Sequence, residues 1–281
     1  MDKGNDIMTP SSSSSDRPRV VVYTAIIDDY DLPLPPRQSD PDVDYILLSN
    51  TPMPKARGWT VRSLPEPARD LPSGDANRWC KMFAHEIFPD HDYSVYLDGN
   101  IRIIGNLKAL RDEFIASHAA IGLFKHPTRS TIDEECTELC DSPRFSPEEK
   151  AAMLAQLNRY RGEMPTGCGV PLSENSIIFR NHRATNLAPA MQLWWEEYRH
   201  NSKRDQLALP WVLQKVDLSV HRWDWSFRHP NPHFIRMPHF SGRSGGALSV
   251  ARYYLSMHRK TLRNQLQCCQ SKRRRARTGK A

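Results

Sequence analysis

The chain alternates short, wholly apolar runs with longer segments in which apolar residues recur at helical spacing. The short runs are rich in β-branched and aromatic residues and end at polar or acidic residues, as buried parallel strands do. Strands are expected at residues 19–27, 44–49, 59–62, 93–98, 119–124 and 176–180. Helices are expected at residues 77–88, 107–117, 147–161, 188–200 and 205–216. Because strands and helices alternate, the pattern predicts an α/β fold with a mainly parallel sheet covered by helices on both faces.

Composition divides the chain into three parts. Residues 1–18 are polar with a run of serines, which predicts a disordered N-terminal segment. Residues 19–245 carry the alternating pattern and form the predicted domain, and residues 246–281 form a basic, amphipathic C-terminal tail. Ten Lys or Arg and no Asp or Glu lie between residues 251 and 281, so the rest of the chain has a net charge of −3 although the whole carries +7. This uneven distribution argues against a nucleic-acid-binding face across the domain.

The composition also bears on the cellular compartment. No apolar run approaches the roughly 20 residues that a bilayer-spanning helix needs. Residues 1–16 lack the apolar core of a signal peptide. The six cysteines show no paired Cys-x-x-Cys spacing, so neither a disulfide scaffold nor a structural zinc site is expected. We therefore expect a cytoplasmic protein with reduced thiols.

Two acidic segments follow predicted strands, at the edge of the sheet where α/β proteins bind ligands. The first is Asp28-Asp-Tyr-Asp31, and the second, Asp98-Gly-Asn100, begins where the strand at 93–98 ends. Oxygen ligands at a strand end suit a divalent cation that also takes oxygens from a bound diphosphate. The same triplet is common in ordinary turns, and both interpretations stay open at this point.

Several other polar groups are candidates for binding phosphate or substrate. Arg78 and Lys81, on the helix before that strand, either reach a phosphate or form a solvated helix face. His126 and Arg129 follow the strand at 119–124, in a segment that is otherwise a charged loop. Asp205 is either a functional carboxylate or an acid in the first turn of a helix. The chain has no P-loop, dinucleotide-binding or nucleophile-elbow motif.

An ordered series of short segments gives the sequence a family resemblance. In chain order they include Tyr23-Thr-Ala-Ile26, Lys81-Met-Phe-Ala-His85, Tyr96-Leu-Asp-Gly-Asn-Ile101, Lys125-His-Pro-Thr-Arg129, Glu174-Asn-Ser-Ile-Ile-Phe-Arg-Asn-His182, Leu193-Trp-Trp-Glu-Glu197 and Ser202-Lys-Arg-Asp-Gln206. Together they resemble the glycosyltransferase-like family catalogued as domain of unknown function 616, which includes plant mucilage-related and turgor-regulation proteins. The resemblance extends over residues 20–216. It implies a GT-A-type, Rossmann-like fold with a mixed, mainly parallel sheet, and a nucleotide-sugar donor.

A more distant similarity to glycogenin-like retaining transferases implies a metal site. Those enzymes carry an Asp-x-Asp at a strand end and a metal-binding His in a His-x-x-Gly turn. The matching positions here are Asp98, Asn100 and His239. Asn100 departs from the pattern, which has a second Asp at that position. On this similarity the three residues are expected to hold Mn²⁺ or Mg²⁺.

The same similarities imply the other site residues. Asp205 and Gln206 match an Asp-Gln pair and are expected to act at the anomeric carbon, with retention of configuration. His126 and Arg129 are assigned to the acceptor or diphosphate region. The donor nucleotide and its diphosphate are expected to contact Thr24, Ala25, Arg78, Lys81, Asp98 and Gly99.

The tail points to a membrane as a possible partner. Its apolar residues, interleaved with Arg and Lys, resemble a helix that lies on an anionic membrane surface. They are Tyr253, Tyr254, Leu255, Met257, Leu262 and Leu266. On this interpretation the protein is peripheral on the inner face of the membrane. The alternative is a disordered tail that binds anions nonspecifically.

The leading hypothesis is a metal-assisted glycosyltransferase of polysaccharide biosynthesis. It moves a hexosyl or related group from a nucleoside-diphosphate sugar to a glycan or lipid-linked acceptor. Some members of the resembling family are linked to ceramide hydrolysis, which keeps a hydrolase of a lipid amide or glycan open. A catalytically silent protein that binds a sugar nucleotide or nucleic acid is the third hypothesis.

Overall fold

A mixed seven-stranded sheet forms the centre of the protein. The computed structural model describes residues 17–164, 171–241 and 246–278. The strands run in the order β3-β2-β1-β4-β7-β6-β8. They are β1 (Val20–Ala25), β2 (Val43–Ser49), β3 (Thr60–Ser63), β4 (Tyr93–Leu97), β6 (Ile121–Lys125), β7 (Ser173–Asn181) and β8 (Val220–Trp223). β7 is antiparallel to β4 and β6 and the other pairings are parallel, so the prediction of a mixed, mainly parallel sheet is confirmed.

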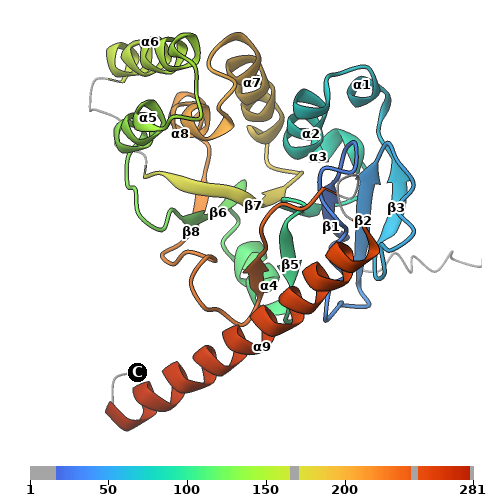
Figure 1. Ribbon diagram of the computed structural model, residues 1–281. Coiled ribbons are helices and arrows are strands. Elements are labelled where there is room, and N and C mark those ends of the chain that lie inside the picture. The colour runs from blue at the N-terminus through green and yellow to red at the C-terminus, as the bar shows by residue number, and fades with distance from the viewer. Residues whose placement is uncertain (1–16, 165–170, 242–245, 279–281) are drawn as a thin grey trace, which may run out of the picture.

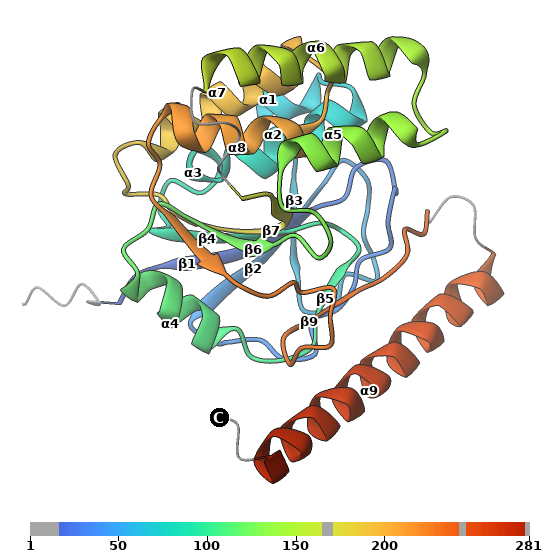
Figure 2. The same cartoon turned by 90° about the vertical axis from the view of Figure 1, so that its left-hand side faces the viewer.

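Helices cover both faces of this sheet (Figures 1 and 2). One face carries α1 (Glu66–Arg69), α2 (Ser73–Met82), α3 (Ala84–Ile87), α5 (Ile132–Asp141), α6 (Pro147–Glu163), α7 (Leu187–His200) and α8 (Asp205–Lys215). The other face carries α4 (Lys108–Ala116), a two-stranded sheet of β5 (Ile101–Ile103) and β9 (Phe234–Arg236), and α9 (Ala247–Thr278). The α/β layering expected from the alternating pattern is therefore present.

The apolar run of β1 explains its central place in the sheet. All six of its residues are buried, and alternate side chains enter different layers. Val21 and Tyr23 belong to the larger apolar cluster beneath α2, α7 and α8, whereas Val22 belongs to the cluster on the α4 side. A strand that is buried on both faces in this way has no polar alternation. Each fully buried side chain of this kind contributes about 1.5–3 kcal/mol to stability.

The elements differ from the sequence prediction in one interrupted helix, in the helices α1 and α5, which lie outside the expected ranges, and in three short strands. The helix expected at residues 77–88 begins earlier, at Ser73, and is interrupted at Phe83, where α2 ends and α3 begins. Phe83 leaves helical geometry and stacks on Trp79, with ring centroids 4.9 Å apart. Strands β5, β8 and β9 were not expected, because runs of three or four residues are too short to show a period of their own.

The C-terminal tail is a helix from Ala247 to Thr278, and one of its faces packs on the protein. Tyr253 and Met257, which the sequence analysis assigned to a membrane-facing surface, are buried against residues that include Ile235 and Met237. That part of the expectation is wrong. None of the described helices is long and apolar enough to cross a bilayer. The segment 1–16 and the predicted domain boundary at residue 245 lie outside the described residues.

Gly105 allows the chain after β5 to approach the segment before β9. A Cβ atom at this position would lie 2.2 Å from the carbonyl oxygen of Pro232. The neighbouring amide of Ile104 donates to the carbonyl of His233 over 2.8 Å, which holds the two backbones together.

We expect Gly105→Ala to lower the free energy of unfolding by about 1–3 kcal/mol, a typical cost of overpacking, as measured by urea denaturation. Gly162, in α6, is a matched control because nothing lies within 4 Å of its added Cβ. Gly162→Ala is expected to stabilise the protein by up to about 1 kcal/mol. Equal stability of the two variants would contradict the prediction.

Candidate functional site

A cavity of about 500 Å³ opens at the edge of the sheet where β1 and β4 end. Five of the residues predicted from the sequence line it: Ala25, Arg78, Asp98, Gly99 and His239. The carboxyl ends of parallel strands meet at one edge, so loops that are distant in sequence converge there. The structure therefore brings residues from β1, α2, the β4 end and the segment after β9 to one hollow.

A buried ion network forms the wall between α2 and α8. The Nζ atom of Lys81 lies 2.7 Å from Oδ2 of Asp205, and Nε of Arg78 lies 3.4 Å from Oδ1 of the same carboxylate. Lys81 is also 3.8 Å from Oδ1 of Asp98. Only 4% of the Lys81 side chain and 10% of the Asp205 side chain are exposed, so solvent screens these contacts little.

The network holds Asp205 and Arg78 in their charged states. Burial raises the pKa of Asp205, but the positive charges of Lys81 and Arg78 outweigh burial and bring the pKa well below its usual value. The Asp205 carboxylate in turn raises the pKa of Arg78, against the effect of burial. A fixed positive charge on Arg78 therefore faces the cavity.

A hydrogen bond from Tyr96 orients the Asp98 carboxylate. The hydroxyl of Tyr96 donates to Oδ1 of Asp98 over 3.0 Å. Burial, followed by the negative charge of Asp98, raises the pKa of Tyr96 well above its usual value. Tyr96 therefore stays protonated and remains a donor, while 28% of the Asp98 side chain is still exposed to the cavity side.

His239, which also lines the cavity, is held by Asp31. Its Nδ1 atom lies 2.9 Å from Oδ2 of Asp31, and its Nε2 atom lies 3.3 Å from Nδ2 of Asn100. The hydrogen bond to Asp31 is the main cause of a raised His239 pKa. Asn100 is buried and directs its amide to the carbonyl of Met237 over 3.0 Å. In this arrangement Asp98 and His239 line the cavity, whereas Asn100 braces His239.

The segment after β1 forms part of the rim of the cavity and has an unusual backbone. Asp28 and Asp29 have φ angles of +53° and +52°, in the left-handed region that aspartate tolerates better than most residues. Asn50 stabilises the turn, because its Oδ1 accepts from the Asp28 amide over 2.9 Å and its Nδ2 donates to the Asp28 carboxylate. Ser73 also donates to that carboxylate. This rim therefore connects β1, β2 and the start of α2.

The sequence analysis singled out this acidic segment but assigned no role to Asp31. It also missed Asn77, which lines the cavity and donates to the carbonyl of Ala25 over 3.0 Å. The acidic run at a strand end was the available signal for Asp31. No comparable signal marked Asn77, whose role depends on the packing of α2 beside β1.

The other predicted residues lie outside the described lining of this cavity. Thr24 is buried in β1. Gln206 donates to the carbonyl of Ser173 over 3.1 Å. His126 and Arg129 lie together, with Nε2 of His126 3.2 Å from the guanidinium, and Arg129 pairs with the buried Glu135 at 2.5 Å. Their proposed roles stay predictions.

The ion network generates a stability prediction. Lys81→Met leaves Asp205 buried with a single remaining cation, so the free energy of unfolding should fall by about 3 kcal/mol, at the lower end of the range for broken buried pairs. Lys203→Met is the control, because Lys203 pairs with Asp75 at 2.6 Å but is 51% exposed. Its loss should cost less than about 1 kcal/mol. If urea denaturation shows the same loss of unfolding free energy in both variants, the buried pair contributes no more to stability than the exposed pair does.

His126 generates a pH prediction. Burial, followed by the charges of Arg129 and Arg228, lowers the pKa of His126 to about 4. An unfolded histidine has a pKa of about 6.5. As the pH falls, the unfolded chain therefore takes up this proton at a higher pH than the folded chain does. The neutral side chain thus stabilises the fold fully above that value, and this stability is lost as pH falls from about 6.5 to about 4, at about 1.4 kcal/mol per pH unit.

The measurement is the free energy of unfolding against pH for His126→Asn, whose side-chain oxygen can replace Nδ1 as the acceptor of the Arg129 amide. The slope over this pH range should decrease in that variant. The exposed His200 provides the control variant His200→Asn, which should keep the slope of the unchanged protein. An unaltered slope in His126→Asn would refute the assignment.

Two solved structures resemble the chain at low sequence identity. Mouse xyloside xylosyltransferase 1, in its apo form, aligns with a TM-score of 0.46 and 12% identity over 72% of this chain and 84% of that one. Core-mannan synthase A from Aspergillus fumigatus, in an Mn/GDP form, aligns with a TM-score of 0.45 and 12% identity, over 82% of this chain and 77% of that one.

Sequence comparison gives a more direct relationship. The probable hexosyltransferase MUCI70 of Arabidopsis thaliana is 24% identical over 161 residues, which are 52% of this chain and 26% of that protein. The chain therefore spans only about a quarter of the length of this relative. The TOD1/MUCI70 glycosyltransferase-like domain matches residues 69–228, more than half of the chain, and confirms the family resemblance seen in the sequence. The protein belongs to the TOD1/MUCI70 family of glycosyltransferase-like domains.

Proposed function

We propose that the protein is a glycosyltransferase that moves a hexosyl or related group from a nucleoside-diphosphate sugar to a glycan or lipid-linked acceptor. The observation that carries this proposal is the family match, which contains Arg78, Lys81, Asp98 and Asp205. These four residues form one charged network beside a cavity at the strand ends. We assign the donor to this cavity, which is also the usual place for ligands in an α/β sheet.

The charge of the network suits the departing diphosphate. Negative charge grows on the leaving group as the bond to the sugar breaks, and fixed positive groups stabilise it. Arg78 lines the cavity, and Lys81 lies behind it on the next turn of α2. Both cations are oriented before the donor arrives, because Asp205 contacts each of them.

The geometry supports a positioning role for Asp205. Its carboxylate is occupied by two cations and lies behind the cavity wall, so direct action at the anomeric carbon would require the network to open. Gln206 is held by Ser173. A direct role for either residue, and retention of configuration, stay hypotheses from the family similarity. His126 and Arg129 we assign to the acceptor or diphosphate region.

A divalent cation, Mn²⁺ or Mg²⁺, fits the site only in part. Within the described ranges, no three His, Cys, Asp or Glu side chains cluster as a metal site. Asp98 offers a carboxylate to the cavity, and His239 has the hydrogen bond from Nδ1 to a carboxylate that metal-binding histidines use. With the donor's phosphate oxygens, these two residues would hold a cation that neutralises charge on the diphosphate. Asn100 turns its Nδ2 amide, and not its oxygen, to Nε2 of His239, so that contact must open before Nε2 binds the cation.

Thermal stability with donors tests the proposal. A ligand that binds only the folded protein stabilises it by about 2.7 kcal/mol at a hundred times its dissociation constant. We expect one of the UDP-, GDP-, CMP- or TDP-sugars to raise the melting temperature, and Asp98→Asn to reduce that rise. Asp224→Asn is the matched control, because Asp224 is 90% exposed and is not part of the cavity lining. Each donor is measured with Mn²⁺, with Mg²⁺ and with EDTA.

The outcomes separate the functional hypotheses. Donor binding with release of the nucleoside diphosphate on adding a glycan acceptor supports the transferase. Stabilisation that persists in EDTA assigns the charge stabilisation to Arg78 and Lys81. Donor binding without turnover would favour a silent binding protein. A chain that binds none of the donors would refute the assignment of the cavity and favour the hydrolase.

A further inference from the structure

Helix α9 presents an apolar stripe that faces away from the protein. Four leucines, Leu248, Leu255, Leu262 and Leu266, are 77%, 51%, 59% and 64% exposed and form what we call the leucine face. At 3.6 residues per turn they lie within about 40° of one another around the helix. The residues of α9 that are buried on the protein lie on the opposite side, so the helix has two distinct faces.

Hydrogen bonds keep the buried face in place. The hydroxyl of Tyr253 donates to the carbonyl of Pro238 over 2.9 Å, and Arg102 donates to the hydroxyl of Thr261 over 3.0 Å. Asn264 donates to the carbonyl of Asn231 over 2.6 Å. Because these contacts are made by one side of α9, the helix cannot turn its leucine face inward without losing them.

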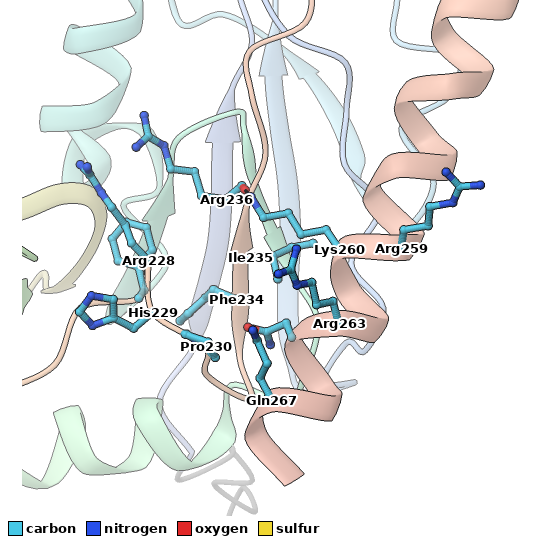
Figure 3. A pocket seen from close by; sticks show the side chains of 12 residues that line it. Arg228, His229, Pro230, Phe234, Ile235, Arg236, Arg259, Lys260, Arg263 and Gln267 are labelled. Carbon is cyan, nitrogen blue, oxygen red and sulfur yellow. Dashed lines mark hydrogen bonds between the residues drawn. The ribbon is translucent and has the colours of Figure 1, made fainter. Parts of the chain in front are cut away.

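Positive charge lies along one side of the leucine face. Arg252, Arg259 and Arg263 lie beside it on the helix, and the chain has no Asp or Glu from residue 247 onward. A cavity of about 590 Å³ lies between α9 and the β9 segment. Figure 3 shows Arg263 and Lys260 of α9 extending towards Ile235 and Arg236, with Gln267 below them.

The cavity has more positive charge than its acidic neighbours neutralise. Arg228 pairs with the buried Glu174, and Lys260 donates to the carbonyl of Arg236. In the part of the chain that the structure describes, no carboxylate pairs with Arg236, Arg259 or Arg263. Burial and the nearby Arg236 lower the pKa of Lys260, as expected where cations crowd together. An anionic group in this cavity would relieve that repulsion.

A second copy of the chain is a poor occupant for this surface. Arg252 and Arg259 lie within about 80° of the leucines on the same side of the helix. Self-association through the leucine face would bring these arginines against each other and bury them without counter-ions, which is costly. An anionic bilayer offers both an apolar interior for the leucines and negative charge for the arginines.

We propose that α9 binds an anionic phospholipid membrane through its leucine face and that the cavity beside β9 receives a lipid phosphate group. The stripe from Leu248 to Leu266 is about 27 Å long, at 1.5 Å per residue. It therefore suits a helix that lies in the plane of the interface, with its apolar side chains about 5–10 Å deep. The arginine stems extend along the same surface and keep their charged ends at the headgroups.

The test is co-sedimentation of the full chain with vesicles of phosphatidylcholine alone and of phosphatidylcholine with phosphatidylserine at about 7:3. Only the anionic vesicles should sediment the protein, and Leu255→Glu/Leu262→Glu should abolish binding. The control is Leu154→Glu/Val61→Glu, which places the same charges on exposed apolar residues of α6 and β3. All four positions are exposed, so the melting temperatures should be unchanged.

A second pair of variants tests the cationic cavity. Arg259→Gln/Arg263→Gln should weaken binding to anionic vesicles about 30-fold, since each basic residue near such a surface contributes about fivefold. Arg144→Gln/Arg199→Gln, on the helical layer across the sheet, is the control and should bind normally. If the leucine variants bind anionic vesicles normally, the interaction is nonspecific charge attraction, and the proposal is wrong. A dimer that the leucine variants dissociate, seen by light scattering, would overturn it as well.

Discussion

The buried ion pair between Lys81 and Asp205 is the contact on which the candidate site depends. It joins α2 to α8 across 124 residues of sequence and lies between the helices and the sheet. Removing two charges from water is costly, and mutual attraction offsets that cost only when the geometry is good. Arg78 provides a second cation, and the N-terminus of α8 adds a favourable dipole to Asp205. Arg78, which faces the cavity from α2, is therefore held by a carboxylate from another helix.

The sheet supports the same network from below. The hydroxyl of Tyr23, in β1, donates to the carbonyl of Cys80 over 3.0 Å, and Arg180, in β7, donates to the carbonyl of Lys81. These donors satisfy carbonyl groups at the end of α2, where the helix has no partners of its own. The fully buried Arg180 thus contributes to the position of Lys81. The contacts that hold the end of α2 on β1 and β7 therefore also determine where the charge of Lys81 lies beside the cavity.

The two basic regions of the protein have different physical characters. In the candidate site the buried Lys81 and the partly exposed Arg78 are paired with Asp98 and Asp205, so their positions are fixed and salt screens them little. On α9, Arg252, Arg259 and Arg263 are exposed and pair with no carboxylate among the described residues, so attraction there is general for anions and sensitive to salt. The first arrangement suits the orientation of one bound group, and the second suits a surface with many charges.

The sequence by itself determined the α/β class and that a strand such as β1 is buried, because its apolar run has no polar face to expose. It also placed Asp98 and the acidic segment at Asp31 at strand ends, because the change from apolar to polar residues at the end of a strand can be read from the sequence alone. Only the tertiary structure decided which groups meet: Asp31 with His239 across 208 residues, and Lys81 with Asp205. It alone also decided which apolar stripe of α9 is buried. Helical periodicity shows that Met257 and Leu262 lie on different sides, but only packing against the protein determines which side remains in solvent.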